Sequence, residues 1–171
     1  MSTSKLCIPT FRNLIIGNYK CTDDLVKALK NEHIYFGDYV IEMLKITELS
    51  KQERMLSLVV LSVNQLGYVR AQGLSKILEI AEDFGLKKCP SEVGPQLRLQ
   101  LGYLPFDVDI TVAMTPIELG DNLGLYNIQD VTSLHWGIRG KHLWRQMCGE
   151  GFVFSPDDQF VFVEEDRPYK E

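Results

Sequence analysis

The sequence has no long hydrophobic run and no excess of positive charge, and each absence excludes a class of partner. No apolar stretch approaches the ~20 residues that a membrane-spanning helix needs. The 18 basic residues are outnumbered by 23 acidic ones and are scattered along the chain, which gives a net charge of −5. Proteins that bind nucleic acid concentrate basic residues on one face. We therefore expect neither a membrane nor a nucleic acid as a partner.

Cysteine and histidine are also scarce. The four cysteines are Cys7, Cys21, Cys89 and Cys148, and the three histidines are His33, His135 and His142. No C-x-x-C pair occurs, and no histidines are paired four residues apart on a predicted helix, so neither a zinc ribbon nor a helical metal site is indicated. The Walker and dinucleotide-binding glycine patterns are absent as well. We expect no metal and no cofactor, and we interpret the cysteines as unpaired thiols in a reducing compartment.

The first residues lack the apolar core of a cleaved secretion signal. Only Leu6, Cys7 and Ile8 stand between Lys5 and Pro9, whereas such a core needs at least about 7 residues. A cytoplasmic location is expected, with export by a secretion system that needs no cleaved signal as the alternative.

The composition that remains is that of a folded, soluble domain. Over 171 residues, 45% are hydrophobic and 24% are charged, which is enough to build a core without disulfide staples. No linker, repeat or low-complexity tract divides the chain. We expect one domain over residues 1–171, with loose tails at about 1–5 and 164–171.

Helical patterns occupy the first hundred residues. Thr22, with two aspartates after it, predicts a helix over 22–31, and the apolar spacing after Gly37 predicts a second helix that forms a hairpin with the first. A third helix is predicted over 74–84, because one face of that segment is apolar. That face consists of Leu74, Ile77, Leu78, Ala81 and Phe84.

Strand patterns occupy the last seventy residues. Three segments read as strands: 108–115, 123–128 and 133–138. Apolar arms at 152–154 and 160–163 predict a closing hairpin, and the apolar run at 56–63 predicts a buried strand in the same sheet. The sequence therefore predicts an α+β domain, with N-terminal helices packed on one face of a mostly antiparallel C-terminal sheet.

Chemical groups are most concentrated in the run CPSEVGPQLRLQ, from Cys89 to Gln100. Residues 96–101 fit both a helix and a strand pattern, and we favour a short helix because Pro90 and Pro95 are compatible with its first turn. The run resembles a segment of small uncharacterised bacterial proteins, a family that implies no activity.

Four side chains of this run are candidate ligand-binding groups, namely Glu92, Gln96, Arg98 and Gln100. An unpaired Arg98 in a cleft would suit a carboxylate or a phosphate, with the two amides as further partners. The structural alternative, which we favour, has Glu92 pair with Arg98 or bind the first N–H groups of the helix, so that the segment locks the helix against the sheet.

Cys89 supports an enzymatic alternative, because a helix start and two neighbouring lysines favour a thiolate. A cysteine-dependent hydrolase or transferase also needs a base, and His135 or His142 could serve if the fold brought either to the thiol; Asp130 could orient His135. Histidines beside aromatic residues are more often structural. We therefore favour a non-enzymatic domain that binds a small molecule or a protein, with self-association through a sheet edge as an option.

The aromatic residues offer one further hypothesis. The C-terminal set consists of Trp136, Trp144, Phe152 and Phe154. We interpret these side chains as core, with a protein-binding patch on the outer face of the sheet as the alternative.

Overall fold

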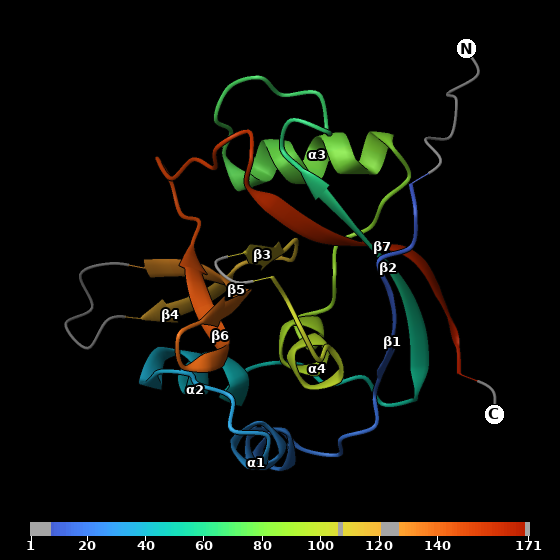
Figure 1. Cartoon of the computed structure of the whole chain (residues 1–171), viewed down its shortest axis with the longest axis vertical. Helices are drawn as coiled ribbons and strands as arrows, with labels where there is room; N and C mark the ends of the chain where they lie inside the picture. Colours follow the sequence, from blue (N-terminus) through green and yellow to red (C-terminus); the bar gives the residue numbers. More distant parts are fainter. Residues whose placement is uncertain (1–7, 106–107, 121–126, 170–171) are drawn as a thin grey trace.

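The computed structural model describes residues 8–105, 108–120 and 127–169. Within them it contains four helices and a curled, mostly antiparallel sheet of seven strands, as Figure 1 shows. The predicted α+β class is therefore confirmed. No helix of the described chain combines the length and the apolar character that crossing a membrane requires.

The elements follow one another as β1 (Arg12–Ile16), α1 (Thr22–Asn31), α2 (Asp38–Lys45), β2 (Arg54–Ser62), α3 (Leu74–Asp83), α4 (Val93–Gln100), β3 (Asp109–Val112), β4 (Ile117–Gly120), β5 (Asn127–Gly137), β6 (Gly140–Met147) and β7 (Gln159–Pro168).

The strands of the sheet are ordered β1-β2-β7-β3-β5-β4, with β6 on the other side of β5. All pairs are antiparallel except β3 with β7. β3 and β4 pair with different parts of β5, at residues 133–135 and 127–130. β5 is therefore the long strand that joins the central sheet to the β6 hairpin.

The helices lie around this curled sheet rather than in one layer. Figure 1 shows α3 over β2 and β7, whereas α4 lies on the other side, inside the curl, with α2 to its left and α1 below it. α4 contacts β1 at one end of the sheet and β5 and β6 at the other. The first six residues of α4, 93–98, are all buried. The chemically rich segment is thus the centre of the fold.

Two hydrophobic clusters hold these layers together. The larger one joins β2, β3 and β7 with α3 and α4. The smaller one joins the α1–α2 hairpin to the sheet and consists of Leu29, Ile34, Val40, Leu44 and Leu143. Leu143 lies on β6, so this cluster fixes the position of the β5–β6 hairpin.

The predicted helices are confirmed, including the ambiguous one. α1 spans the predicted 22–31, although its N-cap is Cys21 rather than Thr22. α3 and α2 match their predicted ranges within a residue or two, and 93–100 is helical. Gly94 allows this last helix to approach β5 closely, because a Cβ there would lie 2.1 Å from the Thr132 hydroxyl oxygen.

The predicted closing hairpin is wrong. The turn at 155–158 forms, but the arm at 152–154 does not pair with 160–163; Phe154 bridges Gln72 instead. β7 pairs with β2 and β3, and it continues to Pro168, so the expected loose tail from 164 onward is strand as far as that residue. Residues 127–128 and 133–137 of the two predicted strands belong to one strand, β5, and residues 123–126 lie outside the described residues.

Candidate functional site

Glu92 is the central polar residue of the 89–100 segment. Its side chain is fully buried, and its carboxylate accepts hydrogen bonds from the backbone N–H groups of Gly17 and Ser50, each at 2.8 Å, and from the Gln96 amide at 3.0 Å. Glu92 therefore joins three separate parts of the chain. No hydrogen bond or ion pair links it to Arg98, and it does not cap the first turn of α4, so the pairing predicted from the sequence is wrong.

The two glutamines are bonded within the chain as well. The Gln100 amide accepts from the Ile15 N–H at 3.2 Å and donates to the Ile15 carbonyl at 2.7 Å, as a neighbouring strand would. Gln96 donates to Asn18 at 2.6 Å and accepts from Gln100 at 3.1 Å. Three of the four candidate ligand-binding groups thus form an internal clamp between α4 and the outer edge of β1.

Arg98 differs from these three residues because it is largely unpaired. Its side chain is fully buried and donates through Nη2 to the Leu101 carbonyl at 2.9 Å, while Nε and Nη1 have no hydrogen-bond partner. Burial lowers the pKa of Arg98 to about 10, so the group stays charged at neutral pH. No carboxylate of the described residues lies within ion-pair distance of it. Among the described residues the guanidinium is thus a buried charge without a counter-ion.

The structure does not bring Cys89 together with a histidine. The Cys89 thiol is buried and donates to the Val161 carbonyl at 3.3 Å, and burial raises its pKa far above the ordinary range. Asp130 does not orient His135 either, because its carboxylate accepts from Arg145 at 3.1 Å. The cysteine-hydrolase hypothesis therefore has no assembled site in this arrangement.

His135 and His142 instead face each other across β5 and β6 and form a stacked aromatic cluster. His135 stacks on Trp144 with ring centroids 4.3 Å apart, and His142 stacks on Tyr35 at 5.2 Å. Nδ1 of His135 lies 2.5 Å from the Asp109 carboxylate. We name these five residues, Tyr35, Asp109, His135, His142 and Trp144, the β5–β6 surface.

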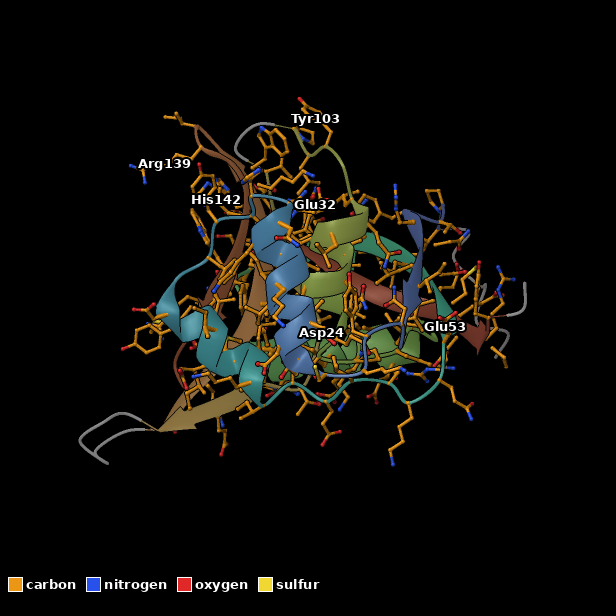
Figure 2. All side chains as sticks on the ribbon, turned by 90° about the horizontal axis from the view of Figure 1, so that it is seen from below. Asp24, Glu32, Glu53, Tyr103, Arg139 and His142 are labelled. Carbon is orange, nitrogen blue, oxygen red and sulfur yellow. The ribbon has the colours of Figure 1, made fainter. Side chains whose placement is uncertain are left out.

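The β5–β6 surface is exposed to solvent although its imidazoles are partly covered. Trp144 is 42% exposed and Tyr35 is 45% exposed. Figure 2 shows His142 at the same end of the molecule as Arg139 and Tyr103. Burial first, and then the charges of His135, Arg139 and Arg98, lower the pKa of His142. This ring is therefore a neutral hydrogen-bond acceptor at physiological pH.

The other face of β6 carries a second exposed aromatic contact. The Arg145 guanidinium lies 4.1 Å from the centroid of the Tyr39 ring, which is a cation–π geometry. Tyr39 and Met147 are both about half exposed, at 52% and 49%. Both faces of β6 thus present large side chains to solvent.

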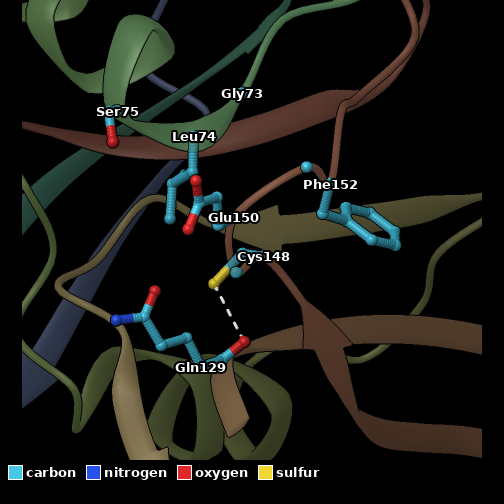
Figure 3. Close-up of a pocket in the computed structure, with 9 residues that line it drawn as sticks. Gly73, Leu74, Ser75, Gln129, Cys148, Glu150 and Phe152 are labelled. Atoms are coloured by element: carbon cyan, nitrogen blue, oxygen red, sulfur yellow. Dashed lines mark hydrogen bonds between the residues drawn. The ribbon is translucent and has the colours of Figure 1, made fainter. Parts of the chain in front are cut away.

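A pocket of about 320 Å³ lies elsewhere, between the start of α3 and residues 148–152 (Figure 3). The Cys148 thiol there donates to the Gln129 carbonyl at 3.4 Å, and burial, with a smaller effect of Asp130, raises its pKa to about 12. Figure 3 shows the Glu150 carboxylate beside Leu74 at this pocket. The negative charge of Glu150 would repel an anion bound at the N-terminus of α3. The raised pKa keeps the Cys148 thiol protonated, so the described lining residues do not form a catalytic site.

The comparisons with protein-family models, curated proteins and solved structures found no match. A candidate site can therefore be assigned only from the geometry of the chain itself. The sequence singled out His135 and His142, but Asp109 and Tyr35 were missed because nothing local in the sequence indicates that they lie beside the histidines.

Proposed function

We propose that this chain is a non-enzymatic binding module that recognises a protein partner through the β5–β6 surface. The observation that carries the proposal is the stacked array of Tyr35, His142, His135 and Trp144 at the solvent boundary. Exposed aromatic side chains that are held in place by their neighbours are typical anchors of protein interfaces.

The shape of this surface favours a protein over a small molecule. Small-molecule sites are concave. The pocket at the start of α3 and a second one beside residues 48–50 are both lined by residues outside the β5–β6 surface. The charges around it also suit recognition, because Arg139 is exposed on the β5–β6 turn while the Asp109 side chain is 58% exposed beside His135.

Rigidity adds to the case for binding. Leu143 is fully buried against α1 and α2, and His135 is held by both Asp109 and Trp144. A surface that is already ordered loses little conformational entropy when a partner docks. The 89–100 segment supports this surface from below, since α4 contacts both β5 and β6.

The test compares Trp144→Ala with a matched control, Val69→Ala. Val69 is 81% exposed and lies outside the β5–β6 surface. A partner is captured from the source cells by cross-linking to the parent chain, identified, purified and titrated against each protein. Trp144→Ala is expected to lose at least about 2 kcal/mol of binding free energy, and Val69→Ala is expected to bind like the parent.

Thermal melts establish that both variants are folded. Equal binding of the captured partner by Trp144→Ala and the parent chain would contradict the assignment of this surface. If only substitutions around the α3 pocket weaken binding of the partner, the binding site is at that pocket and not on the β5–β6 surface.

A further inference from the structure

Both histidines place Nε2 beside Gly137, at the end of β5. A Cβ added to Gly137 would lie 3.0 Å from Nε2 and 3.3 Å from Cδ2 of His135, and 3.3 Å from Nε2 of His142. The ring centroids are 5.6 Å apart, and the two residues are paired across β5 and β6. The two imidazole nitrogens are therefore neighbours of the same glycine, where a side chain would press on both of them.

Hydrogen bonding determines which nitrogen of His135 carries its proton. In the neutral imidazole, Nδ1 donates to the Asp109 carboxylate at 2.5 Å, because an ionised carboxylate only accepts, and Nε2 keeps its lone pair. Nε2 is also the nitrogen that lies nearest to Gly137. A carboxylate bonded to the far side of an imidazole in this way is the usual partner of a metal-binding histidine, because it orients the ring and raises its basicity.

We propose that His135 and His142 bind one divalent transition-metal ion through Nε2, in the space beside Gly137. Neutral imidazole suits Zn²⁺, Ni²⁺ and Cu²⁺, whereas Mg²⁺ and Ca²⁺ take oxygen ligands. Zn²⁺ lies about 2.0–2.1 Å from an imidazole nitrogen, so two such ligands of one ion stand about 3 Å apart. Residues 135 and 142 are paired across β5 and β6 and both Nε2 atoms lie beside Gly137, so rotations of the two side chains bring the nitrogens onto one ion.

Two protein nitrogens leave coordination positions open. No group of three or more potential ligands occurs among the described residues. Water, or a donor atom of a partner that docks on the β5–β6 surface, therefore completes a tetrahedral ion. The stacked rings of Tyr35 and Trp144 hold both imidazoles in position. Uptake of the ion needs no partner, so this proposal stands or fails independently of the proposed function.

Isothermal titration of ZnCl₂ into the purified full chain tests the site. Every protein carries Cys7→Ser and Cys21→Ser, because the exposed thiol of Cys21 can bind Zn²⁺ by itself and Cys7 lies outside the described residues. Saturable uptake of one equivalent is expected. Histidine ¹⁵N spectra record which ring nitrogens shift, and Nε2 of His135 and His142 are expected to do so.

The variants distinguish Zn²⁺ binding at this site from nonspecific binding of Zn²⁺ by any histidine of the chain. Gly137→Ala keeps both histidines but fills the space between them, and His142→Phe keeps an aromatic ring on Tyr35; each is expected to weaken binding at least about tenfold. Asp109→Asn is expected to lose about tenfold through the orientation of His135. His33→Asn removes the third histidine, tolerates the positive φ of that residue, and is expected to bind like the parent.

Melting curves recorded without metal show which variants fold. If Gly137→Ala does not fold, the binding of Zn²⁺ by His142→Phe decides the test. The proposal is overturned if the parent chain takes up no Zn²⁺, or if Gly137→Ala and His142→Phe both bind as the parent does. It is also overturned if only His33→Asn loses the ion.

Discussion

Arg98 is the largest fully buried side chain of the part of the chain that the structure describes, and within that part its charge has no partner. Burial of an unpaired ion costs several kcal/mol. The bond to the Leu101 carbonyl and the packing of its carbon chain must offset that cost. The sequence left two alternatives for Arg98, a structural role and ligand binding. Among the described residues the structure shows one hydrogen bond, to the Leu101 carbonyl, and two guanidinium nitrogens without a partner, so neither alternative is removed.

Substitutions at Arg98 separate packing from charge. Arg98→Ala is expected to lower the free energy of unfolding by about 2–5 kcal/mol, because it leaves a cavity and removes the Leu101 bond. Arg98→Lys should lose less, and Arg98→Met should lose least, because it fills the volume without a buried charge. Urea midpoints measure the order. If Arg98→Met unfolds more easily than Arg98→Ala, the guanidinium has a partner in solution.

The thiols should differ sharply in reactivity. Burial raises the pKa of both Cys89 and Cys148, so these groups stay protonated from neutral pH to about pH 9 and remain covered. In a Cys7→Ser chain, iodoacetamide at pH 8 is expected to label Cys21, which is exposed, and to reach the other two only in urea. Peptide mass spectrometry gives the site of labelling. Rapid labelling of native Cys89 would revive the enzymatic hypothesis.

At the scale of elements, the helices were predictable because their signals are local. α1 and α3 each show apolar residues at helical spacing, and α1 has acidic residues in its first turn. The segment 96–101 fitted two patterns, and its burial between β1 and β5 is consistent with the helical one. Periodicity alone could not decide between them.

The strands were harder because their pairing is not local. β6 reads as a mixed polar segment, since it includes His142, Trp144 and Arg145 and both of its faces are partly exposed. The apolar pattern of β7 is clear, but nothing in it indicates that its partners are β2 and β3 rather than the segment just before it. Sequence patterns give the faces of a strand and not its neighbours.

Gly94 tests the contact between α4 and β5. Gly94→Ala places a methyl group 2.1 Å from the Thr132 hydroxyl and 2.8 Å from its Cβ, so either the helix or the strand must move. A loss of about 1–3 kcal/mol is expected from this overpacking, although alanine favours helices in general. Gly102→Ala, where a Cβ meets nothing within 4 Å, is the control. Equal urea midpoints for the two variants would contradict the close contact.

At the scale of the whole molecule, Glu92 connects three parts of the chain: Gly17 just after β1, the loop before β2, and α4. The sequence correctly marked 89–100 as unusual, but it could not show that partners for Glu92, Gln96 and Gln100 would come from residues 42 to 85 positions away. The recognition surface that we propose lies instead on β5 and β6. Its residues meet only through strand register, which no single segment encodes.

Removal of the Glu92 carboxylate should weaken this connection throughout the fold. Glu92→Ala leaves the Gly17 and Ser50 N–H groups without an acceptor and is expected to cost about 3 kcal/mol or more. Glu92→Gln should also lower the free energy of unfolding, because the NH₂ group of the glutamine would replace one of the two oxygens that accept from the Gly17 and Ser50 N–H groups. Hydrogen exchange at Gly17 and Ser50 is expected to accelerate. Glu79→Ala, on the exposed side of α3, should match the parent.

The Gln100 amide also occupies backbone groups on the outer margin of the sheet. A strand at the margin of a sheet is a template for the strand of another molecule, and fibrils grow by such addition. Ile15 has both backbone groups bonded to Gln100, and the N–H of Gly17, just after β1, is bonded to Glu92, so an incoming chain finds no free backbone group at Ile15 and no free N–H at Gly17. The same residues that hold α4 in place therefore protect the protein from aggregation along this margin.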